Sequence, residues 1–180
     1  MPQDTPLIPI FPPMLARTLV RLPLLPLSLS LTAYSKRATK KHPGLLRRLR
    51  EYDHARFILD PTDLPFVICL EPKGGTPRVT VIRGSAVGDA RIAGPLAALL
   101  GLVHGAFDGD ALFFSRDLVI EGDTAAALAL RNAIDDAELD ISEEIAAMSG
   151  PFARPLQRLF AIVQDRTGVF LSRPEEAALW

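Results

Sequence analysis

The segment 110–139 constrains the fold of this chain more than any other. Its first half is an apolar run rich in aromatic and β-branched residues, which predicts a buried strand over Leu112–Glu121. Asp123 then stands where a helix N-cap belongs, and Ala125–Leu139 is one continuous helical pattern rich in alanine. A strand, a Glu-Gly-Asp turn and a helix in this order predict a sheet with helices packed against it.

The rest of the chain extends this pattern. We expect helices over 13–22, 27–41, 45–52, 96–104 and 156–165, and strands over 57–59, 66–70, 78–83 and 90–93. The 73–75 segment is the expected hairpin connection. The order predicts an α+β fold with a mixed sheet of about five strands. We divide the chain into a basic, Pro- and Leu-rich arm (1–42), a central domain (43–140), and a C-terminal helix and tail that pack on it (141–180).

Composition narrows the class of protein. Hydrophobic residues make up 48% of the chain, which is compatible with a dense core, a lined cavity or an exposed apolar face. The single Cys69 excludes an intramolecular disulfide and a cysteine-ligated iron–sulfur cluster within one chain. The uncharged run 22–35 is interrupted by prolines and too short to span a bilayer, and no secretory signal is recognisable. We expect a cytoplasmic protein.

Charge is divided unevenly along the chain. Residues 1–57 carry ten Lys and Arg against three acids, whereas the remaining residues carry ten against eighteen. Tyr34 is the only aromatic residue between 13 and 50, so stacking with nucleic acid is not expected. Leucines alternating with basic residues favour contact with an anionic membrane surface, with docking to a partner or to the chain's own core as alternatives. The candidate membrane-contact residues are Leu15, Arg17, Leu19, Arg21, Leu22, Lys36, Arg37, Lys40 and Lys41.

No pattern indicates catalysis or a cofactor. His42, His54 and His104 lie far apart in sequence and have no metal-ligand spacing. Cys69 lies inside an apolar strand, where a buried and inert thiol is expected. The acids between 135 and 144 lack the glycine of a calcium-binding loop and suit a solvated helix end. We therefore expect no catalytic residue, no metal and no cofactor.

The motif LVIEGDT at 118–124, followed by a helix with the Arg131-Asn132 pair, resembles the sterol carrier protein type-two domain. It looks like the bacterial UbiT branch of that family, the accessory factors of oxygen-independent ubiquinone biosynthesis. The resemblance covers about 45–140. It implies a hydrophobic cavity between sheet and helices, lined by Phe66, Ile68, Leu99, Leu102, Val103, Phe113, Phe114, Leu118, Ile120, Leu130 and Ile134.

The resemblance also implies a function. A protein of this branch is a peripheral membrane factor that binds polyprenylated phenol or quinone precursors and presents them to UbiU–UbiV-type hydroxylases, without catalysing a reaction itself. Two alternatives stay open from the sequence: a general carrier of phospholipids or fatty acyl chains, and a protein-only adaptor without a lipid ligand. An acyl hydrolase is disfavoured because no nucleophile-elbow pattern is present.

Overall fold

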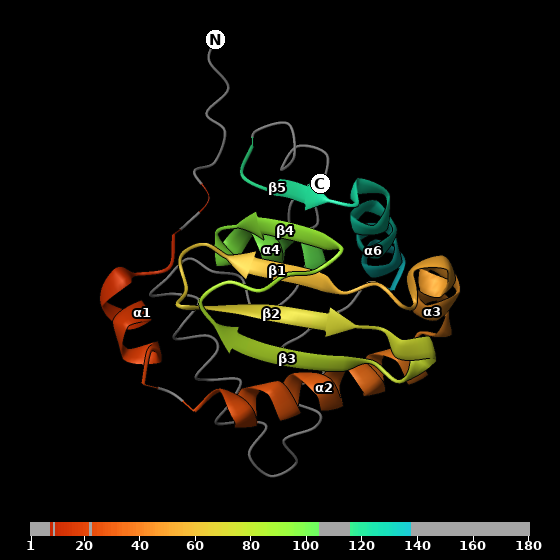
Figure 1. Cartoon of the computed structure of the whole chain (residues 1–180), viewed down its shortest axis with the longest axis horizontal. Coiled ribbons are helices and arrows are strands. Elements are labelled where there is room, and N and C mark those ends of the chain that lie inside the picture. The colour runs from red at the N-terminus through yellow and green to blue at the C-terminus, as the bar shows by residue number, and fades with distance from the viewer. Residues whose placement is uncertain (1–7, 9, 22, 105–115, 138–180) are drawn as a thin grey trace, which may run out of the picture.

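A computed structural model describes residues 8, 10–21, 23–104 and 116–137, which form a five-stranded sheet with helices around it (Figure 1). The strands are β1 (Phe57–Pro61), β2 (Phe66–Glu71), β3 (Arg78–Arg83), β4 (Ala90–Gly94) and β5 (Val119–Gly122), in the spatial order β3-β2-β1-β4-β5. β1 and β4 are parallel, and the other neighbouring strands are antiparallel. The predicted α+β class with a mixed five-stranded sheet is confirmed.

The first four predicted strands are confirmed to within two residues of their ends. β4, the weakest of them in sequence, lies inside the sheet between β1 and β5. Its signal is weak because it is built from small residues, and the structure gives the reason for Gly94. A Cβ at Gly94 would collide with the backbone carbonyl of Asp117 and the side chain of Leu118.

β5 corrects the opening prediction. The strand begins at Val119 instead of Leu112, and residues 112–115 lie outside the described part of the chain. Arg116 has a left-handed backbone (φ 64°), so the chain turns just before the strand. β5 is also not a buried strand, because three of its four residues are exposed. Among the described strands it pairs with β4 alone.

The helices are α1 (Pro13–Leu19), α2 (Leu24–Lys41), α3 (Pro43–Leu49), α4 (Leu96–His104) and α6 (Thr124–Ala137), with short 3-10 turns at Arg50–Tyr52 and Lys73–Gly75. The prediction for α4 is confirmed. α1 ends three residues earlier than expected. α2 begins three residues earlier than expected, because its first turn accommodates Pro26. The predicted helix 45–52 is shifted: Pro43 starts α3, and the last turn tightens into 3-10 geometry. α6 confirms the Asp123-capped helix, and the predicted helix 156–165 lies outside the described residues.

The main core lies between the helices and one face of the sheet. We call this the helix face; it carries Phe57, Leu70, Ile92 and Ile120. Four helices contribute other side chains of the same hydrophobic cluster: α3, α4, α6 and the second half of α2, through Tyr34 and Ala38. α6 packs against both α3 and α4. Figure 1 shows α3 and α6 at one end of the sheet, with α4 beside β1 and β4. Burial of this apolar surface is the main driving force for the fold.

The opposite face, which we call the outer face, is part apolar and part charged. Ile58, Val67 and Cys69 form a small buried cluster there. The neighbouring Arg91 on β4 bonds to Asp60 of β1 and Glu121 of β5, so it bridges three strands. The outer face is thus stabilised by a cross-strand ion network as well as by apolar contacts.

α2 lies along the free edge of β3 and bonds to its backbone (Figure 1). The Thr32 hydroxyl accepts a hydrogen bond from the Val79 N–H (3.0 Å) and donates one to the Val79 carbonyl (2.9 Å). The Ser28 hydroxyl accepts from the Val81 N–H (2.9 Å) and donates to the Leu24 carbonyl. These side chains satisfy edge groups that would otherwise be available to pair with another chain.

α1 is attached at both of its ends. The Asp63 carboxylate accepts one hydrogen bond from the Phe11 N–H (2.8 Å) and another from the Leu96 N–H (2.9 Å) in the first turn of α4. Arg83 donates to the carbonyl of Val20, just after α1 (2.7 Å). The N-terminal segment is therefore held at both ends of the short helix, once to the β1–β2 turn and once to the end of β3.

Candidate functional site

The apolar layer between the helix face and the helices contains most of the described candidates for ligand lining. Leu99 and Leu102 of α4, Leu118 before β5 and Leu130 of α6 are buried in one cluster, and Ile120 and Ile134 pack against it. Three elements, α4, β5 with the residue before it, and α6, thus bring these side chains together. The cavity itself and its occupancy stay predictions.

The other predicted lining residues are placed less centrally or not at all. Phe66 and Ile68 lie two residues apart on β2 and are half-buried; strand alternation puts them on the helix face with Leu70. Val103 belongs to α4, but its side chain is not described. Phe113 and Phe114 lie outside the described residues. The orientation of β5, which sequence could not assign, is now clear: Ile120 pairs with Ile92 and faces the core, whereas Val119 points outward.

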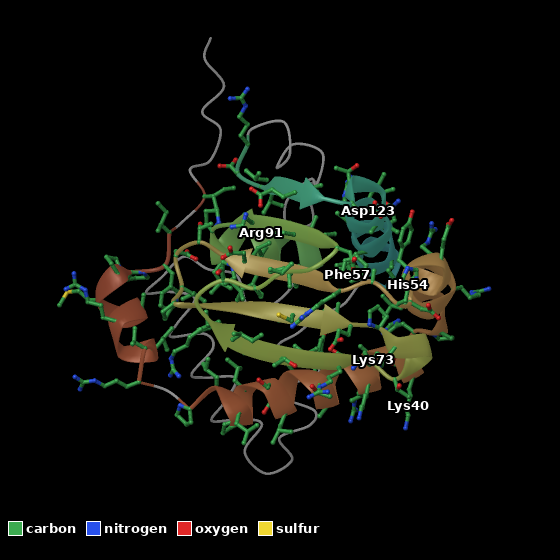
Figure 2. The ribbon with its side chains drawn as sticks, viewed as in Figure 1. Lys40, His54, Phe57, Lys73, Arg91 and Asp123 are labelled. Atoms are coloured by element: carbon green, nitrogen blue, oxygen red, sulfur yellow. The ribbon has the colours of Figure 1, made fainter. Side chains whose placement is uncertain are left out.

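Each residue of the Glu-Gly-Asp turn has a structural role. Glu121 accepts a hydrogen bond from Arg91 (2.6 Å) on the outer face. Gly122 has a φ of 81°, and a Cβ there would collide with the carbonyl of Asp89. The Asp123 carboxylate accepts from the Ala126 N–H (3.0 Å), so the predicted N-cap is confirmed. Figure 2 labels Asp123 at the start of α6. This turn fixes α6 against the core.

The alanines of α6 allow close helix packing. Ala126, Ala127 and Ala133 are fully buried in the main cluster, with Leu130 between them. Small side chains let α6 approach α3 and α4 closely. Their burial in the cluster gives these residues a packing role at this interface.

Arg91 has the one resolved shift in pKa among the described residues. The Arg91 guanidinium donates hydrogen bonds to the carboxylates of Asp60 and Glu121. These bonds, the one to Asp60 most of all, raise its pKa above the ordinary value. Because arginine is protonated at all physiological pH values, the charge stays constant and the network acts as a fixed clamp across three strands. About a third of the Arg91 side chain is exposed, so solvent screens these ion pairs.

The candidate membrane-contact residues are largely at the surface. Arg17, Arg21, Lys36, Arg37, Lys40 and Lys41 are exposed, and Leu19 is half-buried. The side chain of Leu15 is not described, and Leu22 lies outside the described residues. The most exposed large apolar side chains of the arm are not among these candidates. They are Met14 (79% exposed), Leu25 (70%), Ile10 (68%) and Leu29 (62%).

A groove between α2 and β3 was not anticipated from the sequence. It has a volume of about 570 Å³ and is lined by Leu25, Ser28, Leu29, Thr32, Lys36, Lys73, Thr76, Pro77, Arg78, Val79, Thr80 and Val81. The spacing of Leu25, Ser28, Leu29, Thr32 and Lys36 is that of one helix face. This signal was present in the sequence, but it was interpreted only as an alternation of leucines and basic residues.

Residues with catalytic or metal-binding chemistry do not gather in the described part of the chain. Cys69 is buried in the outer-face cluster, as predicted. His54 is exposed and lies 3.7 Å from its neighbour Asp53. Within residues 8, 10–21, 23–104 and 116–137, no group of three His, Cys, Asp or Glu side chains is arranged to hold a metal ion. Over the same residues, no helix has both the length and the apolar character needed to cross a membrane.

Two solved structures illustrate what this chain is similar to in shape. The UbiJ-SCP2 ubiquinone synthesis protein superimposes with a TM-score of 0.53 at 17% identity, over 66% of this chain and 97% of that one. A sterol carrier protein 2 crystal structure gives 0.46 at 17% identity, over 59% and 92%. At these identities the first likeness shows a shared fold and nothing more. No curated protein matches the chain in sequence.

Sequence comparison with family models adds the decisive finding. The model of the SCP-2 sterol transfer family matches residues 31–135, which is more than half of the chain and extends from within α2 almost to the end of α6. The resemblance to the sterol carrier family that the Glu-Gly-Asp motif suggested is thereby confirmed. The chain belongs to the SCP-2 sterol transfer family.

Proposed function

We propose that this protein is a non-catalytic lipid-binding accessory factor that holds a polyprenylated ubiquinone precursor between the helix face and the helices. The observation that carries the proposal is the family match over 31–135, because it includes the layer formed by Leu99, Leu102, Leu118 and Leu130. An exposed polyprenyl tail costs about 25 cal/mol per Å² of apolar surface in water. A carrier that encloses the tail removes this cost while a modifying enzyme acts on the ring.

The assignment to ubiquinone synthesis has two supports. One is the resemblance of the LVIEGDT motif and the following helix to the UbiT branch. The other is the shape shared with the UbiJ-SCP2 ubiquinone synthesis protein. In this proposal, UbiU–UbiV-type hydroxylases receive the precursor and supply the iron–sulfur chemistry that a chain with a single, buried cysteine lacks.

The N-terminal arm would attach the carrier to the membrane from which it takes its lipid. We place the protein in the cytoplasm, peripherally attached to an anionic membrane through the basic residues of 1–42, of which Arg17, Arg21 and Lys40 are exposed. Each basic residue near an anionic leaflet contributes on the order of 1 kcal/mol. Arm and central domain then act in sequence: the arm meets the bilayer, and the domain takes the lipid.

The test is mass spectrometry of lipid extracted from natively purified protein. The variant pair Ile68→Gln and Ile120→Gln adds polar groups on the helix face at positions that are half-buried, so folding is retained more readily than with a change in the core. The matched control is Val87→Gln with Val119→Gln, two exposed valines. We expect the wild type and the control to retain a prenylated phenol or quinone precursor and the helix-face pair to lose it.

The other outcomes are equally informative. Phospholipid or fatty acid in place of a quinone precursor would contradict the pathway and identify a general carrier. Absence of lipid, even after incubation with precursor, would contradict lipid binding and leave a protein-only adaptor. Equal retention by the helix-face pair and its control would place the ligand elsewhere.

A further inference from the structure

The groove between α2 and β3 exists because the helix and the strand are joined by hydroxyl groups. Ser28 and Thr32 are four residues apart, a rise of about 6 Å along a helix, and they bond to Val81 and Val79, which are about 6.8 Å apart along an antiparallel strand. The two periods agree, so successive turns of α2 meet successive outward-facing groups of β3. α2 therefore runs antiparallel to β3.

The next turn of α2 breaks this pattern. Lys36 follows Thr32 by four residues and lies toward Pro77 and Arg78, where the strand begins. Pro77 has no N–H, so no hydroxyl is required to satisfy it. The position is occupied by a cation instead. The groove consequently has two different ends, one beside Val81 and one beside Pro77.

The Pro77 end is basic. Lys36, Lys73 and Arg78 line it, and none of the residues that line the groove is acidic. Lys73 has a partner in Glu71 (3.5 Å), but both of these side chains are solvent-exposed enough for the pair to be weak. Figure 2 shows Lys73 at the β2–β3 hairpin, near the C-terminal end of α2. Three cations thus form the setting that a phosphate group prefers.

The opposite end is apolar and open to solvent. Leu25 and Leu29 line it, and both are more than 60% exposed. They lie one turn apart on α2, on the side that also carries Ser28 and Thr32. An apolar strip that continues into a cluster of cations matches an amphiphile that has an anionic headgroup.

The backbone of β3 argues against an extended peptide in this groove. A peptide that binds by strand addition needs the outward N–H and carbonyl groups of the edge strand. At Val79 and Val81 the N–H groups already donate to Thr32 and Ser28. The groove therefore offers side chains of two kinds, basic and aliphatic, and no edge for pairing.

We propose that this groove is a second ligand site, which binds the phosphate headgroup of one anionic membrane phospholipid at Lys36, Lys73 and Arg78 and the start of its acyl chain along Leu25 and Leu29. The site is separate from the helix-face layer because none of the residues that line the groove belongs to the main hydrophobic cluster. Its volume of about 570 Å³ is within the range of about 300–1,000 Å³ typical of small-ligand sites. The role of this site on a membrane rests on the proposed function, whereas lipid binding at the groove does not depend on that function.

The experiment is NMR titration of the full chain, ¹⁵N- and methyl-labelled, with short-chain lipids below their micelle concentration. The probes are dihexanoyl phosphatidylglycerol, dihexanoyl phosphatidylcholine and inorganic phosphate. We expect phosphatidylglycerol to shift the amides of Lys36 and Arg78 and the methyls of Leu25 and Leu29. The pair Lys36→Glu and Arg78→Glu should weaken this binding by about tenfold or more. The control pair Arg47→Glu and Arg116→Glu makes the same change in net charge at exposed positions that do not line the groove.

Three results would overturn the proposal. Equal affinity for phosphatidylcholine would show that the cations do not select the headgroup. Inorganic phosphate that binds as tightly as the lipid would show that the leucines contribute nothing. Shifts confined to Leu102, Leu130 and their neighbours would place the lipid in the helix-face layer alone. In that case lipid binding in the helix-face layer would stand while the groove site would be refuted, so the two proposals fail separately.

Discussion

The helix face and the β3 edge both hold helices against the same sheet, but by opposite chemistry. On the helix face, α3, α4 and α6 are joined to the strands by alanine and leucine side chains in one dry cluster. At the β3 edge, the first half of α2 is joined by two hydroxyls that bond to backbone groups, and only its second half packs into that cluster, through Tyr34 and Ala38. The first contact buries apolar surface, whereas the second leaves Leu25 and Leu29 of α2 exposed to solvent. This is why one sheet can have a stable core and still present apolar side chains to solvent.

This difference separates stability from surface function. Residues that determine whether the protein folds should lie mainly on the helix face. Residues that determine what the surface binds should lie mainly along α2, where Leu25 and Leu29 are exposed although they belong to a well-formed helix. Changes in the two regions should therefore give different signatures.

The largest effect is expected at Phe57, which is 1% exposed and lies in the main cluster at the start of β1. Figure 2 labels it at the end of the sheet near α3 and α6. Phe57→Ala should lower the free energy of unfolding by about 3–5 kcal/mol, because it removes a large buried ring and leaves a cavity. Denaturant unfolding measures this. Phe57→Leu should cost clearly less, and equal losses for both would mean that the ring does not fill the core.

A smaller loss is expected at the β3 edge. Thr32→Val keeps the side-chain shape but leaves the Val79 N–H and carbonyl without their partner, at a cost of about 1–3 kcal/mol. Hydrogen exchange at Val79 should accelerate more than at Val67, which lies in the middle of the sheet. The matched control is Thr39→Val, since the Thr39 hydroxyl bonds only within α2. If both variants behaved alike, the hydroxyl contact would not hold α2 in place.

Local signals in the sequence predicted the elements of the fold well. The N-cap at Asp123, the apolar helix at Leu96–His104 and the hairpin at 73–75 each depend on neighbouring residues, so a linear pattern contains them. The class of fold followed from the order of these elements along the chain, whereas the spatial order of the strands did not. The family followed from a short motif whose residues the structure explains one by one, from the Glu121 ion pair to the Gly122 turn.

The features that sequence reasoning missed depend on contacts between distant residues. β5 is exposed because, among the described strands, it pairs on one side only, and the composition of a strand does not reveal its place in the sheet order. Ser28 and Thr32 were missed because hydroxyls inside a helix usually bond to their own backbone, whereas here they meet a strand about 50 residues away. Asp63 was missed for the same reason: a carboxylate in a turn gives no sign that it joins Phe11 to α4.

Asp63 tests how strongly the N-terminal segment is coupled to the helix face. Asp63→Ala should lower stability by about 1 kcal/mol, because the first turn of α4 loses an acceptor for the Leu96 N–H. The same change should release the Phe11 N–H, which hydrogen exchange detects. Asp63→Asn keeps one carbonyl oxygen and should retain part of both bonds. Unchanged protection at Phe11 in the alanine variant would show that α1 is held from its other end, through Arg83 and Val20.

The smallest effect on stability, and the sharpest separation of the two regions, is expected from Leu25→Ser with Leu29→Ser. Both side chains are mostly exposed, so the free energy of unfolding should change by less than about 0.5 kcal/mol per site. The affinity for vesicles that contain phosphatidylglycerol, measured by sedimentation, should nevertheless fall by about tenfold or more, because each leucine that enters the bilayer contributes up to about 1.5–3 kcal/mol. The control, Val87→Ser with Leu128→Ser, changes exposed apolar residues outside α2 and should leave vesicle binding intact. Unfolding of the α2 variant would mean that these leucines support the core, and undiminished vesicle binding would mean that α2 does not meet the membrane; either result would remove the distinction between a helix face that stabilises and an α2 surface that binds.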